Sequence, residues 1–333
     1  MSFLTSSLIL VGFLAGALLQ GLHAEPAQTP PIGLTDIEPS KEPPFLLTAP
    51  SSARQGEAML VGFRIVHGES VRDPSKLAKQ LVFAGKTYPL FWDVADYEAQ
   101  CGNKNPLLCK PTDLSSESYH YHLDYTALIG VPVDLPPGDY PLSVAGVSGL
   151  NQVIHIKAGG YSRQNIAVTK TMGGLQPEPG ELEAIEAFKK AVMPERWWQL
   201  PLTPPTPDCM NSAFGNLRFY NGKFTGKFHK GIDTRSPQGR PVKASTDGVV
   251  TIARVYRLHG GTVGVDHGQG LKTIHIHLSK ILVKPGQRVR QGQTLGLVGA
   301  TGFATGPHLH WGVFAGGEPV NPVWITRGIR PCG

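Results

Sequence analysis

Histidine and aspartate side chains recur in three short segments of the second half of the sequence. His229 and Asp233 lie four positions apart, beside a glycine. Imidazole and carboxylate groups are the ligands that zinc takes in hydrolases, where a catalytic site uses three protein ligands and leaves one position for water. These residue types therefore predict metal-assisted hydrolysis, without the helical His-Glu-x-x-His motif, which the sequence lacks. The other two segments each carry a His-x-His pair: His275 with His277, and His308 with His310.

The pattern around these histidines predicts strands. Side chains two positions apart on a strand share a face, so each His-x-His pair is expected to project together. A single His-x-His pair is more often part of a surface or a core than of a metal site. Two pairs and a His-x-x-x-Asp segment in one glycine-rich domain instead favour a site built on a rigid sheet. The apolar side chains between the histidines would then face the other way: Ile274, Ile276, Leu309 and Trp311.

The composition predicts what positions these segments. The chain of 333 residues holds 40 Gly and 29 Pro, which favours many short strands joined by turns. Its length favours about two domains. Strand-like runs at 58–63, 79–83 and 135–144 predict a small antiparallel β-sandwich over residues 45–168. The Pro-Gly-x-Tyr turn at 137–140 resembles those of immunoglobulin-like modules.

A helix is expected after the sandwich. Leu182, Ile185, Phe188 and Val192 recur at helical spacing within 180–196, with glutamates early and lysines late, as a helix dipole favours. We therefore predict a connecting helix and linker over 169–208. A second domain follows over 209–333, so the expected fold is mainly β with one connecting helix.

The amino terminus predicts export. Leu8 to Leu19 form an apolar stretch of the length found in signal peptides, and Ala24 is the small residue needed before a cleavage site. Residues 1–24 are therefore predicted to be a signal peptide, and residues 25–44, with six Pro, a linker. No Lys or Arg precedes the apolar stretch, so an uncleaved membrane anchor is the alternative. Either way the body of the chain would lie outside the cytoplasm, periplasmic or extracellular.

The four cysteines fit an oxidising compartment. Cys101 and Cys109 flank a short polar stretch, as a loop-closing disulfide would, whereas Cys209 and Cys332 bracket the second domain. Four cysteines allow three pairings, and the sequence leaves the other two open. A zinc knuckle is the rival interpretation, but no pair has its two-residue gap.

Charge divides the chain unequally. Residues 1–196 carry 15 Lys and Arg against 20 Asp and Glu, a net of −5, whereas residues 197–333 carry 16 against 5, a net of +11. A basic half beside an acidic half suggests an anionic partner for the second half. Nucleic acid and an anionic cell envelope are both candidates on charge alone, and a merely soluble surface is the third interpretation.

Seven segments of the second half occur together, in order, in a known family. They resemble the lysostaphin/LytM-type metallopeptidases (family M23), with Phe228–Asp233 matching its His-x-Gly-x-Asp signature. The resemblance covers about Cys209 to Val323 and implies an antiparallel β-sheet peptidase domain over 209–333. The segments that carry it are Ser212–Arg218, Phe228–Asp233, Pro241–Ala244, Asp247–Val250, Asp266–Gly268, His277–Ser279 and Thr305–His310.

The resemblance also implies roles for individual side chains. His229, Asp233 and His310 would hold one zinc ion per chain, which lowers the pKa of water toward neutrality so that it can attack an amide. His277 and His308 would share general-base catalysis and oxyanion stabilisation, and the sequence does not assign one role to each. Two further residues are expected to face the cleft. They are Arg218 and His275, which stands where the family commonly has Tyr.

Family members cut peptides of peptidoglycan, so the resemblance implies a zinc-dependent endopeptidase acting on its cross-links or bridges. D-alanyl cross-links rank ahead of glycine bridges. The partner would be peptidoglycan rather than nucleic acid, with no stable membrane span after signal cleavage. Two other functions stay open: a non-catalytic activator of another wall hydrolase, and a secreted bacteriolytic enzyme against competitors.

Overall fold

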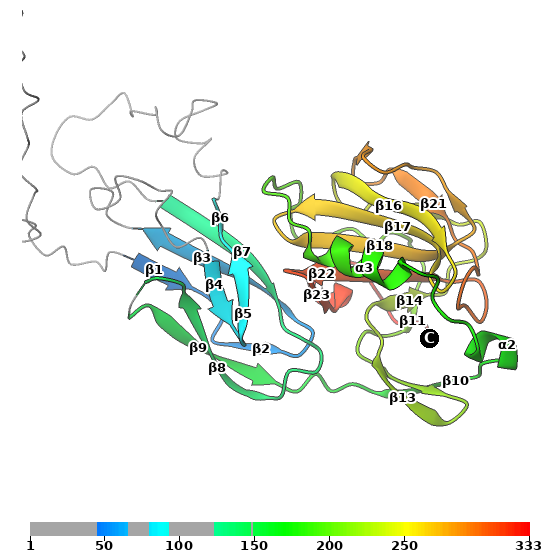
Figure 1. Cartoon of the computed structure of the whole chain (residues 1–333), viewed down its shortest axis with the longest axis horizontal. Helices are drawn as coiled ribbons and strands as arrows, with labels where there is room; N and C mark the ends of the chain where they lie inside the picture. The colour runs from blue at the N-terminus through cyan, green and yellow to red at the C-terminus, as the bar shows by residue number, and fades with distance from the viewer. Residues whose placement is uncertain (1–44, 66–79, 93–122, 148) are drawn as a thin grey trace, which may run out of the picture. The chain divides into compact units, whose positions relative to one another are not determined.

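The computed structural model describes residues 45–65, 80–92, 123–147 and 149–333. The predicted signal peptide, the proline-rich linker, Cys101 and Cys109 lie outside the described residues, so these predictions stay untested. The described chain is mainly β, as predicted, with its strands gathered into several sheets (Figure 1).

The first part of the described chain is a β-sandwich, as the turn and strand pattern predicted. Two sheets enclose one core, and side chains alternate between buried and exposed along strands such as 151–157. Phe63, Phe83, Ile129 and Ile154 are fully buried there. One sheet has the order β1 (Phe45–Thr48), β3 (Ala58–Ile65), β7 (Leu123–Gly130), β6 (Phe91–Trp92), and the other β2 (Ser52–Arg54), β9 (Asn151–Lys157), β8 (Gly138–Val144), β4 (Gln80–Phe83), β5 (Lys86–Pro89).

The second part contains a large antiparallel sheet that carries the predicted histidines. Its core lies on the face of Trp311, Val263 and Leu309, all of which are fully buried. Glycines at the two ends of the central strand 260–268 let other segments approach its backbone closely, Thr301 at Gly260 and the Glu195 carbonyl at Gly268. Along the sheet the order is β11 (Met210–Ser212), β14 (Ile232–Thr234), β22 (Leu309–Ala315), β18 (Leu271–Leu278), β17 (Gly260–Gly268), β16 (Gly248–Tyr256), β20 (Arg288–Val289), with β23 (Glu318–Val320) paired to β22.

Two smaller sheets and a disulfide complete this part. A disulfide joins Cys209 to Cys332, beside the first strand of the large sheet. This is one of the pairings that the sequence left open. One small sheet has the order β15 (Pro241–Lys243), β21 (Thr294–Leu297), β19 (Lys280–Ile281), and a 3₁₀ turn, η4 (Pro322–Ile325), follows β23. The other has the order β10 (Arg163–Ile166), β12 (Leu217–Tyr220), β13 (Lys223–Phe228), with β10 parallel to β12.

The connecting helix is present as α3 (Glu181–Lys190), preceded by one turn of helix, α2 (Lys170–Gly173). Phe188 of α3 packs against Phe314, 6.0 Å between ring centroids and edge-on, on the outer face of the large sheet (Figure 1). The helix is shorter than the periodic pattern, which ran to Arg196. It ends because Ala191 adopts an extended ψ of 144°, and Pro194 three residues later disfavours continued helix.

The amino-terminal end of α3 is fastened to the β16–β17 turn. Glu181 is fully buried and accepts hydrogen bonds from the backbone N–H groups of Leu258 and His259. Its Oε1 lies 2.6 Å from His259 Nδ1. The His259 carbonyl in turn accepts the backbone N–H of His277, so this contact helps to fix the end of β18. Within the described residues, neither helix combines the length and hydropathy required to cross a membrane.

Candidate metal centre

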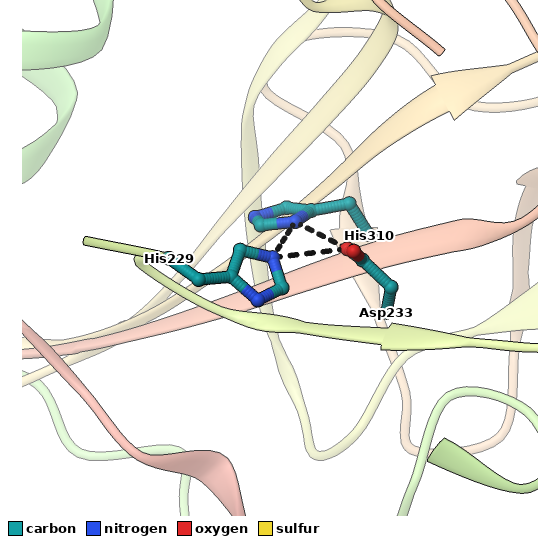
Figure 2. A group of neighbouring side chains, drawn as sticks. All are labelled: His229, Asp233 and His310. Atoms are coloured by element: carbon teal, nitrogen blue, oxygen red, sulfur yellow. Dashed lines mark hydrogen bonds and ion pairs between the residues drawn. The ribbon is translucent and has the colours of Figure 1, made fainter. Parts of the chain in front are cut away.

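Two side chains from neighbouring strands and one from the loop after a third strand meet at one point (Figure 2). Asp233 on β14 and His310 on β22 are directly opposite in register, so both project from the same face. His229 follows the end of β13 and reaches the same place. Its Nε2 lies 3.0 Å from Asp233 Oδ1 and 2.9 Å from His310 Nδ1, and His310 Nδ1 lies 2.8 Å from Asp233 Oδ1. The three predicted ligands are thus brought together.

The donor set at this point fits a cation. The Nδ1 atom of His229 lies 2.9 Å from the carbonyl oxygen of Ala213, an acceptor, so Nδ1 carries the hydrogen and Nε2 keeps a lone pair. That lone pair is directed at a carboxylate oxygen and at a second imidazole nitrogen. A cation bound between these three atoms would be stabilised by all of them. Two imidazoles and one carboxylate are a ligand set that zinc accepts in catalytic sites.

Charge and burial favour the ligating protonation states. Burial alone would raise the pKa of Asp233, but His229 and His310 beside it hold that pKa well below its usual range. Burial lowers the pKa of His310 to about 4, against the opposing pull of Asp233. Because metal binding requires an ionised carboxylate and a neutral imidazole, both shifts favour the states that bind a metal.

His277 and His308 lie beside this group and line the same cavity of about 730 Å³. Their ring centroids are 4.8 Å apart, and the His277 ring is 6.3 Å from that of His310. Each Nδ1 lies 2.8 Å from a backbone carbonyl, of Thr301 and Gly306 respectively. Each Nδ1 therefore donates its hydrogen, so Nε2 is the ring nitrogen of each that can accept a proton. Burial, and then the neighbouring His308, lower the pKa of His277 to about 3, so it is neutral at pH 7.

His275 does not face the cavity, and this corrects the expectation from strand alternation. It is fully buried opposite Trp311 on the core side of the sheet, and desolvation lowers its pKa to about 3. Ile276, expected on the core side, instead lies opposite His310, and both Ile274 and Ile276 line the cavity. The apolar side chains of β18 therefore form part of the floor of the site.

The difference arises at a break in the strand. His277 has a φ of +65°, and the pairing of β17 with β18 shifts register, with Gly261 opposite Leu278 and Val263 opposite His275. Thr262 alone on β17 thus stands opposite both Ile276 and His277 on β18, which is a β-bulge. The bulge turns His277 to the face opposite that of His275.

Arg218, the other expected cleft residue, does line the cavity. Its guanidinium atom Nη2 lies 3.2 Å from Asp233 Oδ2, and its side chain is only 11% exposed. Arg218 is therefore placed to hold the carboxylate in position.

Two polar residues that contact these side chains or line the cavity were not predicted: Ser212, whose hydroxyl lies 3.1 Å from His229 Nδ1, and Gln164 on β10. Ser212 lies in a segment of the resemblance and could have been found there. Gln164 carried no local signal, because a parallel pairing of β10 with β12 joins segments more than 50 residues apart.

A His-Asp-His centre on an antiparallel sheet, with two further imidazoles beside it, is an arrangement suited to single-metal hydrolysis. Comparison with known families points to a particular one. Residues 227–322 of the chain match the model of peptidase family M23. The resemblance expected from the seven segments is confirmed over these residues.

Relatives of known name share this domain. The chain is 43% identical over 117 residues to the DD-carboxypeptidase/endopeptidase Mpg of Neisseria meningitidis, covering 35% of this chain and 27% of Mpg. It is 50% identical over 93 residues to the peptidoglycan DD-endopeptidase ShyA of Vibrio cholerae, covering 28% of this chain and 22% of ShyA. The match thus spans about a quarter of the length of these relatives. A Pseudomonas aeruginosa crystal structure assigned to peptidase M23 matches with a TM-score of 0.52 at 26% identity, covering 80% of this chain and 92% of that one.

Proposed function

We propose that this protein is a zinc-dependent endopeptidase that hydrolyses peptide cross-links of peptidoglycan. One observation carries the proposal: three converging donor atoms lie beside two imidazoles whose Nε2 lone pairs are available. His229, Asp233 and His310 would hold the ion. When bound, zinc supplies a Lewis acid that polarises a carbonyl and lowers the pKa of water.

The chain's own residues supply proton transfer and positioning. His277 and His308 are held in one tautomer by the Thr301 and Gly306 carbonyls, so either Nε2 is ready to accept a proton from an attacking water. Once protonated, an imidazole can stabilise the developing oxyanion and return the proton to the leaving amine. The apolar floor of Ile274 and Ile276 excludes water beneath the scissile peptide and strengthens these interactions.

The substrate is inferred from charge and from the relatives. The net charge of +11 over residues 197–333 favours an anionic polymer. The relatives Mpg and ShyA are named as DD-endopeptidases, which supports D-alanyl cross-links ahead of glycine bridges. Action on peptidoglycan requires a periplasmic or extracellular location, in keeping with the Cys209–Cys332 disulfide and the predicted signal peptide.

Digestion of purified peptidoglycan tests the proposal, with products identified by mass spectrometry. We expect wild-type protein to cleave cross-links, chelator to abolish cleavage and added zinc to restore it. His308→Ala should lower the rate about 10²–10⁴-fold, the usual contribution of a general acid–base group. His155→Ala is the matched control, because His155 lies on β9 of the sandwich and is exposed.

The termini of the products identify the bond that is cut, and negative results test the proposed function itself. A new D-alanine carboxyl terminus would establish a DD-endopeptidase, whereas glycine termini would indicate bridge cleavage. Cleavage at the wild-type rate in His308→Ala, or any cleavage after complete metal removal, would contradict the mechanism. Wild-type protein that cuts nothing but stimulates another wall hydrolase would establish a non-catalytic activator instead.

A further inference from the structure

One amide oxygen outside the matched family segment lies at the centre of the hydrogen bonds behind the metal ligands. Gln164 Oε1 accepts from the Ser212 hydroxyl at 2.8 Å and from Arg218 NH1 at 2.7 Å. Asn216 Nδ2 donates to the same oxygen at 3.3 Å. Three donors from three different residues therefore converge on one neutral acceptor.

Two of these donors lead directly to ligands. The Ser212 hydroxyl gives its hydrogen to Gln164, so its oxygen is free to accept from His229 Nδ1, 3.1 Å away. Arg218 donates one hydrogen bond from Nη1 to Gln164 Oε1 and another from Nη2 to Asp233 Oδ2, 3.2 Å away. Gln164 thus orients the outer partner of one imidazole ligand and the outer partner of the carboxylate ligand. Outer partners of this kind fix ligand tautomer and ring orientation.

The backbone places Gln164 there. β10 pairs in parallel with β12, and Gln164 is directly in register with Arg218. Gln164 and Ile166 alternate with exposed neighbours along β10, and both line the cavity. Residues 163–166 precede the segment matched to family M23 by more than 60 positions. The strand that supports the site is therefore contributed by the chain that follows the sandwich.

We propose that Gln164 is a positioning residue for the metal centre, acting through Ser212 and Arg218. The proposal rests on the proposed zinc function of His229, Asp233 and His310. A neutral acceptor suits the place, because it satisfies the guanidinium without competing with Asp233 for the positive charge. Without it, the Ser212 hydroxyl and one Arg218 N–H would lose their partner. The Arg218–Asp233 pair would then be less firmly oriented, and His229 would keep only the Ala213 carbonyl as a firmly placed outer partner.

Zinc affinity, measured by chelator competition on the full-length protein, tests this inference independently of catalysis. Gln164→Leu removes the acceptor at similar length and should weaken zinc binding about 10–100-fold, the range found for outer partners. Gln164→Glu keeps an acceptor oxygen but adds a negative charge that competes with Asp233 for Arg218, so it should recover only part of the affinity lost in Gln164→Leu. Asn165→Ala is the matched control: its Oδ1 accepts from Gly222 N at 2.7 Å, on the same strand but away from the site.

A double-mutant cycle separates positioning from a general loss of structure. If Gln164 acts through Ser212, the losses of zinc affinity in Gln164→Leu and Ser212→Ala should be strongly non-additive. Affinity in Gln164→Leu within twofold of wild type would overturn the proposal. So would an equal loss in Asn165→Ala, which would indicate that β10 matters only as a strand. Normal zinc affinity in the wild type without peptidoglycan cleavage would instead contradict the proposed function and leave this inference standing.

Discussion

The two His-x-His pairs have the same sequence pattern and different structures. His308 and His310 share a face, as alternation requires, and both line the cavity. His275 and His277 do not, because a bulge with a left-handed φ at His277 separates them. One imidazole of that pair is a core residue and the other lies in the site. Identical spacing therefore supports two assignments, and the hydrogen-bonding register of the sheet decides between them.

A sheet can place functional side chains in two ways, on a regular strand or at a break in a strand. His310 sits on a regular strand, where its pairing opposite Asp233 fixes the position of a proposed ligand. His277 sits at a strand break, held by the Thr301 carbonyl through Nδ1 and by the His259 carbonyl through its backbone N–H. Bulges are frequent next to active sites because they redirect one side chain without ending the strand.

The largest effect is expected from the regular pair. His310→Ala removes one of the three proposed ligands, so zinc affinity should fall by more than the roughly 100-fold that loss of an outer partner costs. Peptidoglycan cleavage should then be undetectable at stoichiometric zinc. Chelator competition and product analysis measure the two losses. Retention of tight zinc binding in this variant would mean that the ion is held elsewhere.

The next effect separates the two members of the broken pair. His277→Ala should lower the cleavage rate about 10²–10⁴-fold while zinc affinity stays near that of wild type, because His277 is placed in proton transfer rather than ligation. Rates on peptidoglycan and zinc titrations are measured on the same preparations. If zinc binding fell as far as in His310→Ala, His277 would have to be counted among the ligands.

The sequence predicted much of the site, and the part it missed has a physical reason. The ligand set follows from residue types and family resemblance, because zinc chemistry restricts both. The face of His275 did not follow, since a bulge depends on pairing with β17 rather than on local composition. Gln164 was missed for a related reason: its role depends on a register between strands far apart in the chain. The end of α3 near Lys190 differed by a few residues because Val192 continues the periodicity beyond the helix.

The smallest effect at neutral pH is expected at His275. Its Nε2 has no hydrogen-bond partner within the described residues and is buried, and its Nδ1 makes only a 3.3 Å contact with the Val263 carbonyl. His275→Leu replaces it with an apolar side chain of similar size, so zinc affinity and cleavage rate should stay within about threefold of wild type. A rate loss as large as that of His277→Ala would restore His275 to the cleft.

Acid pH sharpens the same comparison through stability. The pKa of His275 is about 3 in the fold against about 6.5 in the unfolded chain, so between these values the unfolded state binds the extra proton. Its contribution to stability is thus complete above pH 6.5 and is lost as pH falls toward 3.

Urea unfolding of the metal-free proteins at pH 7.5 and 4.5 should show wild type losing more stability than His275→Leu, by about 1–3 kcal/mol. Because His267, His277 and His310 also titrate in this window, only the difference between the two proteins reports on His275. Equal losses in both proteins would mean that His275 is solvated in solution, and the two histidine pairs would then be alike after all.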